Sequence, residues 1–205
     1  MVDMTSWFRR HFRMAAALAL GVAILPGYLR AFKVVTPSEA PSVNIGDRFL
    51  VNEAAYSLRL PYSERTLVRM RAPKRGDMVQ LVLPHSDFHG IKRVIGLPGE
   101  TVEFRENRVL INGRMLPLTP LNRADFNWVA PANHIGSDVF NEDGHLISFT
   151  PGRSRLRNLP PVTLGAHELY VVGDNRDGSL DSRIWGPVAE NRILGKVLMT
   201  YARGQ

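Results

Sequence analysis

Short apolar stretches separated by turn residues dominate the chain from residue 32 to residue 201. Stretches of about four to eight residues rich in Val, Ile, Leu and Phe are typical of β-strands. No helical pattern alternates with them, so a parallel βαβ arrangement is not indicated. The pattern therefore predicts a mainly β fold built on an antiparallel β-sheet. The strands that we expect span residues 48–51, 78–83, 91–95, 101–104, 109–111, 169–172 and 193–201.

Two turn signals organise the middle of the chain. Glu106-Asn107 separates two apolar runs and predicts a hairpin, and Asn112-Gly113 after it is a second turn signal. Residues 114–165 are turn-rich and weakly patterned, which predicts an inserted variable lobe of short strands and loops. Residues 52–75 show no clear period, and we expect them to be irregular.

The N-terminal region has the pattern of a membrane anchor. Residues 14–29 carry no charge and are rich in Ala and Leu, and basic residues precede them. A membrane-spanning helix needs about 20 apolar residues, and snorkelling by Arg13 and Arg30 can cover the deficit. The prediction is a short cytoplasmic tail over 1–13, a single transmembrane helix over 14–31, and a β-rich domain over 32–205 outside the membrane. A cleaved signal peptide or a buried core helix remain alternatives for this segment.

Composition narrows the chemistry. The net charge is +7 and the pI about 10.2, but the basic residues are scattered and no nucleic-acid-binding motif accompanies them. We therefore expect no nucleic-acid partner. The chain has no cysteine, which excludes disulfides and thiolate metal sites. We expect neither a metal nor a cofactor.

One lysine stands out on the expected strand at 91–95. Of the 26 basic residues only four are lysines, and Lys92 lies beside Arg93 in an otherwise apolar stretch. Arginine stays protonated in proteins, whereas burial favours the neutral form of a lysine, which is a base. A side chain that snorkels to water is the alternative interpretation.

Two loops carry the other candidate residues. Two prolines in residues 36–47 forbid regular structure, so this is a stiff loop that holds three hydroxyl side chains and can position a nucleophile. The Asp-rich segment 173–183 suggests calcium, but the EF-hand spacing fails because Arg176 occupies the third position. A hydrogen-bonded, salt-bridged loop that fixes its neighbours is the alternative.

Together the three blocks resemble the bacterial signal peptidase I family, membrane-bound endopeptidases with a Ser/Lys dyad. The resemblance covers about residues 34–113 and 166–198. It implies that Ser38 is the nucleophile and Lys92 the general base. It also implies an oxyanion hole formed by the backbone N–H of Ser38 and the hydroxyl of Thr36.

The resemblance assigns supporting roles as well. Ser179 matches a hydroxyl that orients the lysine, and Asp181 and Arg183, with Arg93, match a structural salt-bridge set. The chain departs from the family pattern at Glu39, where the family typically has methionine.

By the same resemblance, the substrates would be signal-peptide-bearing preproteins of a bacterial cytoplasmic membrane, cut on its periplasmic side. The lipid bilayer is the second expected partner. Glu39 motivates two alternatives: a specialised maturation protease of a secretion or conjugation system, and a degenerate homologue that only binds peptides.

Overall fold

The structure is a computed structural model, and it describes residues 9–16, 27–60, 63, 65–84, 86–122, 125, 138–150 and 156–202. Within these residues the chain is mainly β, and the neighbouring strands of each sheet run antiparallel. The predicted fold class is thus confirmed for the β-rich part. Residues 9–16 are helical and exposed.

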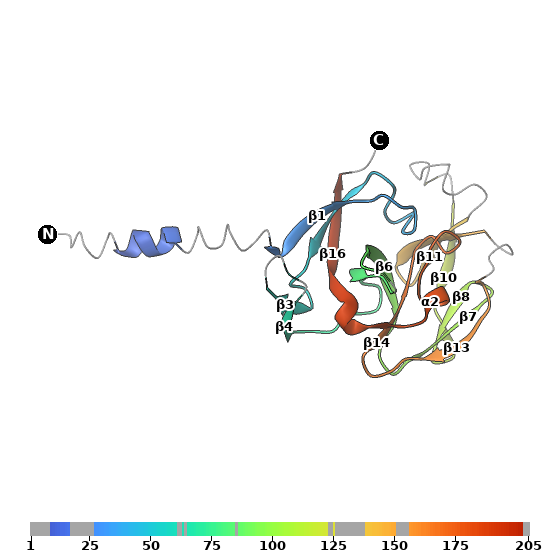
Figure 1. Ribbon diagram of the computed structural model, residues 1–205. Coiled ribbons are helices and arrows are strands. Elements are labelled where there is room, and N and C mark those ends of the chain that lie inside the picture. Colours follow the sequence, from blue (N-terminus) through green and yellow to red (C-terminus); the bar gives the residue numbers. More distant parts are fainter. Residues whose placement is uncertain are drawn as a thin grey trace.

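The largest sheet has seven strands in the order β1-β2-β16-β5-β6-β14-β15. Its members are β1 (Leu29–Lys33), β2 (Arg48–Asn52), β5 (Met78–Val82), β6 (His89–Gly96), β14 (Glu168–Val172), β15 (Val188–Ala189) and β16 (Ile193–Ala202). Figure 1 labels β1, β16, β6 and β14 among them. Because β16 pairs with β2 and β5, the last strand of the β-rich region is hydrogen-bonded to strands from its first half.

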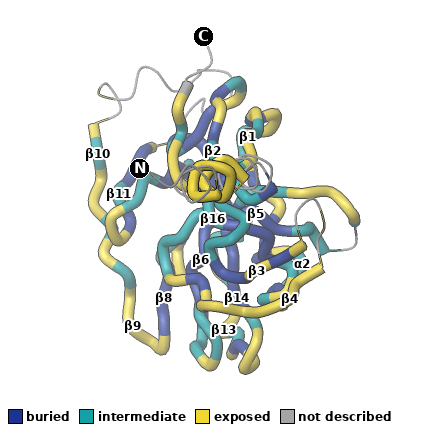
Figure 2. Tube along the Cα trace, turned by 90° about the vertical axis from the view of Figure 1, so that its left-hand side faces the viewer, coloured by how far each residue is buried: buried dark blue, intermediate teal, exposed yellow. Residues whose placement is uncertain are grey.

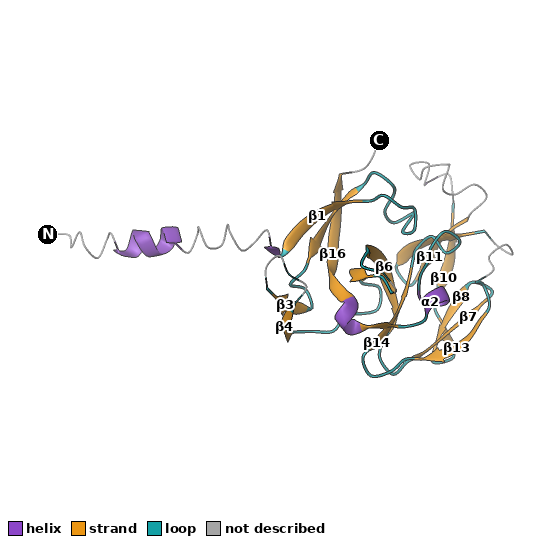
Figure 3. Ribbon diagram, in the orientation of Figure 1, coloured by secondary structure: helices purple, strands orange, loops and turns teal. Residues whose placement is uncertain are grey.

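Three smaller sheets complete the fold, with the orders β13-β7-β8-β9, β10-β11-β12 and β3-β4. Their strands are β3 (Ser57–Arg59), β4 (Thr66–Arg69), β7 (Thr101–Arg105), β8 (Arg108–Ile111), β9 (Arg114–Met115), β10 (Leu118–Leu121), β11 (Asp138–Glu142), β12 (His145–Phe149) and β13 (Leu159–Thr163). Helical structure in this region is limited to short pieces such as α2 (Ser182–Trp185) and the 3₁₀ turn Glu190–Arg192 (Figure 3).

Strand β6 separates two hydrophobic cores. Successive side chains of a strand point to opposite faces of its sheet. Val94 accordingly packs in one buried cluster with Val79, whereas Ile95 packs in another with Phe104. Figure 2 shows β6 and β14 among the buried strands and β4 and β9 as exposed ones. Side chains on β6 are therefore held in a well-packed environment.

The predicted strands are all present, with small differences at their ends. The hairpin of β7 and β8 turns at Glu106 and Asn107, whose φ angles of 49° and 64° are both positive. Asn112 and Gly113 also have positive φ, 51° and 79°, as an Asn-Gly turn requires.

The expectation of irregular structure over residues 52–75 is wrong in part. Strands β3 and β4 form a small antiparallel ribbon in this region. All four residues of β4 are exposed, so no alternation of apolar and polar positions could reveal it.

The segment 114–165 is only partly a separate lobe. Strands β10, β11 and β12 form their own sheet, but β9 pairs with β8 and β13 pairs with β7. Residues 123–124, 126–137 and 151–155 of the predicted lobe lie outside the described residues.

The predicted transmembrane helix falls mostly on residues 17–26, which also lie outside the described part of the chain. Among the residues that the structure does describe, no helix has both the length and the apolar character needed to cross a membrane. The predicted C-terminal bound needs correction, because residues 29–31 begin β1 and pair with β2.

Candidate active site

Lys92 lies on β6 with its side chain buried. Only 4% of the residue is exposed. Its Nζ donates hydrogen bonds to Ser38 Oγ at 3.0 Å, to Glu39 Oε1 at 2.8 Å and to the carbonyl oxygen of Ile91 at 2.6 Å. The structure thus brings together the two residues that the sequence predicted as nucleophile and base, although 54 positions separate them.

Ser38 lies on the loop of residues 34–47, between β1 and β2. Backbone hydrogen bonds close this loop: the N–H of Val34 donates to Asp47 O at 2.8 Å and the N–H of Gly46 to Val34 O at 2.9 Å. The side chain of Asp47 also accepts a hydrogen bond from the backbone N–H of Asn44 at 2.8 Å. The loop has no helix or strand of its own, as its prolines predict. These contacts close the loop between β1 and β2; we call residues 34–47 the nucleophile loop after the predicted role of Ser38.

Thr36 lies next to Ser38 at the exposed side of the loop. Its Oγ1 is 3.4 Å from Ser38 Oγ. A hydroxyl at this position can donate a hydrogen bond to a substrate oxygen bound next to Ser38. This position fits the predicted role in an oxyanion hole.

Glu39 is the residue whose role sequence reasoning missed. It is 2% exposed, and its Oε1 pairs with Lys92. Its Oε2 has no hydrogen-bond partner among the described residues. Burial raises the pKa of Glu39 to about 7, against the opposing effect of the positive charge on Lys92. The departure from the family pattern marked this position, but nothing local in the sequence indicates a contact with a residue 53 positions away.

The segment 173–183 is hydrogen-bonded to the backbone of the nucleophile loop. The backbone N–H of Asn175 donates to Ser38 O at 3.0 Å, and its side-chain Nδ2 donates to Pro37 O at 3.1 Å. At Gly173 the backbones approach so closely that an added Cβ would lie 2.5 Å from Ser38 O. Asn175 was not predicted as a site residue, although it lies within the block that carries the resemblance.

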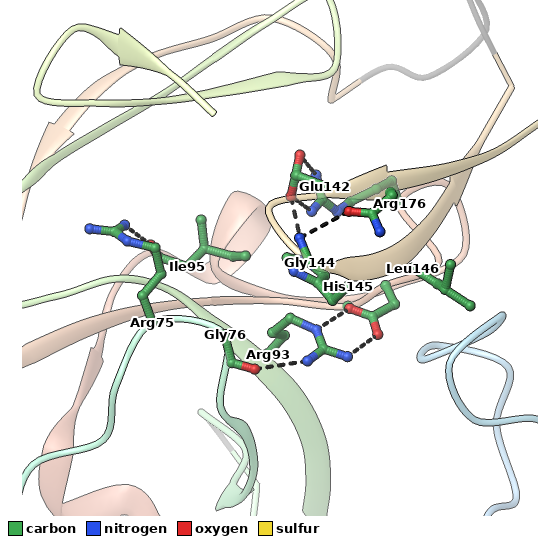
Figure 4. Close-up of polar contacts among 12 residues, drawn as sticks. Arg75, Gly76, Arg93, Ile95, Glu142, Gly144, His145, Leu146 and Arg176 are labelled. Atoms are coloured by element: carbon green, nitrogen blue, oxygen red, sulfur yellow. Dashed lines mark hydrogen bonds and ion pairs between the residues drawn. The ribbon is translucent and has the colours of Figure 1, made fainter. Parts of the chain in front are cut away.

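Arg93 points to the opposite side of β6 from Lys92 and holds a second network. Its Nε and Nη2 donate to the two carboxylate oxygens of Asp174 at 2.7 and 2.6 Å. Its Nη1 donates to Gly76 O at 2.8 Å (Figure 4), and Nη2 reaches Ser42 Oγ on the nucleophile loop at 3.3 Å. The expectation that Arg93 joins Asp181 and Arg183 is therefore corrected: its partner is Asp174.

Asp181 and Arg183 form the predicted ion pair. Arg183 Nη2 lies 2.8 Å from Asp181 Oδ2, and the same oxygen accepts a hydrogen bond from the N–H of Gly173 at 3.0 Å. Burial alone would raise the pKa of Asp181, but the hydrogen bonds and charge of Arg183 lower it. This buried carboxylate therefore anchors the end of β14 just before the loop that carries Asn175.

Ser179 does not contact the lysine in the way the resemblance implies. Within the described residues, the partners of Lys92 Nζ are Ser38, Glu39 and Ile91, and Ser179 is not among them. Ser179 is buried against Gly173 instead, where an added Cβ would lie 2.2 Å from its Oγ. Its orienting role stays a prediction.

Residues of β11 and β12 contact both the segment 173–183 and the nucleophile loop. The carboxylate of Glu142 pairs with the buried guanidinium of Arg176, with Nη1 3.2 Å from Oε1 (Figure 4). On the other side, Ser42 Oγ donates to Leu146 O at 3.1 Å. The segment 114–165 therefore braces both the nucleophile loop and the loop that carries Arg176, a role that the sequence did not predict.

A pocket of about 150 Å³ opens beside Ser38. Its wall includes Val34, Thr36, Glu39, Phe49, His89 and Ile91. It is a mixed site, in which apolar side chains meet the carboxyl group of Glu39. No group of three or more side chains suited to hold a metal ion occurs in the described parts of the chain. What the arrangement can supply is a serine hydroxyl, a buried amine and donors for an anion.

Comparison with known proteins identifies the family to which this chain is similar. Residues 4–202 match the family described as signal peptidase, peptidase S26. A signal peptidase I of Pseudomonas aeruginosa is 30% identical over 193 residues, covering 88% of this chain and 67% of that protein. The signal peptidase I of Aquifex aeolicus is also 30% identical, over 92% of this chain and 82% of its own length.

A solved structure is similar as well. The crystal structure of a signal peptidase I from Enterococcus faecalis matches with a TM-score of 0.40 at 28% identity, over 63% of this chain and 99% of that one. The family match over nearly the whole chain carries the conclusion. The chain belongs to the signal peptidase family, peptidase S26, and is a peptidase.

Proposed function

We propose that the chain is a membrane-anchored serine endopeptidase that removes N-terminal signal peptides from exported proteins with a Ser38/Lys92 dyad. The observation that carries the proposal is the 3.0 Å distance between Lys92 Nζ and Ser38 Oγ, within hydrogen-bond reach for proton transfer. The names of the relatives supply the substrate class.

The first half of the reaction forms an acyl-enzyme. A serine hydroxyl is a weak nucleophile until a base takes its proton. The neutral amine of Lys92 accepts that proton while Ser38 Oγ bonds to the scissile carbonyl carbon. The N–H of Ser38 and the Thr36 hydroxyl stabilise the negative oxygen, and Lys92 then passes the proton to the leaving amine.

The second half releases the product. A water molecule attacks the acyl-enzyme while Lys92 takes its proton. The amine returns a proton to Ser38 Oγ as the ester bond breaks. Ser38 and Lys92 thus end each cycle in their starting state.

Membrane attachment rests on the N-terminal sequence and on the surface beside the pocket. Residues 14–29 are uncharged. Val35 and Phe88 are 77% and 76% exposed. Val35 lines the pocket, and Phe88 precedes His89, which also lines it. Exposed apolar side chains at the entrance suit a site that works at a bilayer surface, where anchoring also raises the local concentration of tethered substrates. We place the catalytic domain on the periplasmic side of a bacterial cytoplasmic membrane.

The test is cleavage of a purified signal-bearing precursor by the full chain in phospholipid vesicles. Ser38→Ala and Lys92→Arg are each expected to abolish cleavage, because the first removes the nucleophile and the second a base that can lose its proton. Thermal unfolding checks that both variants fold. Cleavage at the wild-type rate by either variant would refute the dyad.

A narrower function is favoured by one observation, the carboxyl group of Glu39 in the pocket wall. Such a group narrows the range of side chains that the pocket accepts, as expected of a maturation protease for a few substrates. A panel of unrelated precursors separates the two functions: turnover of most of them indicates a general peptidase.

A further inference from the structure

Glu39 and Lys92 form a buried ion pair inside the proposed catalytic dyad. Their side chains are 3% and 5% exposed, and the 2.8 Å contact is shorter than the 3.0 Å contact between Lys92 and Ser38. The amine therefore lies between a hydroxyl and a carboxylate. As an ammonium it has no lone pair with which to accept the serine proton.

We propose that Glu39 is a positioning residue that holds Lys92 as an ammonium at rest and takes its proton when substrate fills the pocket. The inference rests on the proposed function and deepens it. It makes the working base of the site a Lys–Glu pair rather than a lysine alone.

The proton steps balance without any further reactant. At rest Nζ carries three protons and the carboxylate none. Substrate expels water from the pocket, and a drier site disfavours two separate charges relative to two neutral groups. One proton then passes from Nζ to Oε1, and the freed lone pair accepts the proton of Ser38. After product release the proton returns from Glu39 to Lys92.

The surroundings of Glu39 make it a suitable acceptor. Its Oε2 has no hydrogen-bond partner among the described residues, so Lys92 is its main direct stabilisation. Burial raises its pKa to about 7, close to the range in which a peptidase works.

Other charged groups face the pair from several elements. Asp174 raises the pKa of Glu39 and Arg93 lowers it, and these two are paired with each other. Glu142 acts on Arg93 from β11. Lys33 and His89, both exposed, also line the pocket. Asp174 and Arg93 act on Glu39 in opposite directions, whereas Lys92 is the charged group in direct contact with it.

The test is the pH dependence of kcat/KM for precursor cleavage by the full chain, measured from about pH 5 to about pH 10 in wild type and Glu39→Gln. Without the carboxylate, Lys92 loses the paired negative charge that favours its ammonium form and keeps only the neutral acceptors Ser38 Oγ and Ile91 O. We expect the acid limb of the profile to move to lower pH by about 1 to 3 units. At pH about 6 the activity relative to each enzyme's own maximum would then rise about tenfold or more.

Controls separate this role from a structural one. Glu100→Gln removes a carboxylate that lies outside the pocket lining and pairs with Arg75 at a distance of 2.5 Å. This variant should leave the acid limb in place. Glu39→Met is the second variant if Glu39→Gln does not fold. Glu39→Asp keeps the carboxylate and should lie between wild type and Glu39→Gln.

An unchanged acid limb in Glu39→Gln or Glu39→Met, with only a lower plateau, would overturn the inference and leave the dyad intact. Failure of the dyad itself has a different signature: cleavage by Ser38→Ala at the wild-type rate. The two proposals can therefore fail independently.

Discussion

Nζ of Lys92 donates to Oε1 of Glu39 at 2.8 Å, and both side chains are almost fully removed from solvent. A buried charge is tolerated only while it is paired, because its desolvation is otherwise uncompensated. In the proposed mechanism the same two groups contribute to the folding of the site and to its chemistry, so each variant at either position must be assessed for both.

Lys92→Met is expected to destabilise the fold by about 3–5 kcal/mol near pH 8, because it leaves the Glu39 carboxylate buried without a counter-charge. The effect should be smaller near pH 5. In wild type burial raises the pKa of Glu39 to about 7 although Lys92 lowers it, and without Lys92 the pKa is higher still. Near pH 5 the carboxyl is therefore protonated in both folded proteins, and the extra cost in Lys92→Met develops as the pH rises above about 7. Urea unfolding at both pH values measures this.

The double variant Lys92→Met/Glu39→Met is the matched control for that measurement. It removes both charges, so it should be less destabilised near pH 8 than Lys92→Met alone. Equal losses in the single and double variants would mean that the ion pair does not govern the stability of the site.

Glu142 should make the fold sensitive to acid. Burial alone would raise the pKa of Glu142, but the charge of Arg176 lowers it. A carboxyl with a lowered pKa stabilises the fold above its ordinary value of 4.5 and loses this contribution as the pH falls below that value. Glu142→Gln should therefore lower stability by about 3–5 kcal/mol at pH 7.

The difference between Glu142→Gln and wild type should narrow as the pH falls below about 4.5, since wild type then loses the same charge. Thermal unfolding at neutral and acid pH follows both proteins. A difference that stays constant across that range would show that the carboxylate charge is not what Arg176 requires.

Gly173→Ala should reduce cleavage strongly. The new Cβ would meet Ser38 O at 2.5 Å and Ser179 Oγ at 2.2 Å, and the backbone oxygen cannot move without displacing the nucleophile. Gly165→Ala is the matched control, because the nearest atoms to its Cβ belong to the side chain of Glu168, at 3.2 Å and beyond, and not to backbone. A displacement of about 1 Å in a catalytic group can lower the rate about a hundredfold. Similar kcat values for the two variants would contradict the close approach.

The sequence predicted the strands well because short apolar runs and the turns between them are local signals. The Asn112-Gly113 turn and the apolar β14 were both evident from their residues. Strand β4 was not, because its residues are all exposed; its backbone pairs with β3, and Arg69 forms an ion pair with Glu190.

The candidate site was predictable to the extent that it follows motif blocks. Lys92 is in contact with Ser38, the residue that the resemblance pairs with it, and the catalytic roles of Ser38, Thr36 and Lys92 stay predictions. The partner of Arg93 and the ion pair of Glu39 depend on contacts between residues 81 and 53 positions apart. Such pairings are set by the register of the sheet and by loop packing, which a single sequence does not display.

The central claim is that an amine at position 92 takes the proton of Ser38. Because the chain has no cysteine, a Lys92→Cys variant can be alkylated at that position alone, in denaturant, with a reagent that adds an aminoethyl group and restores a lysine-like amine after refolding. Precursor cleavage is measured before and after alkylation. We expect no cleavage by the unmodified variant and recovery of cleavage after alkylation. Wild-type cleavage by unmodified Lys92→Cys would contradict the account.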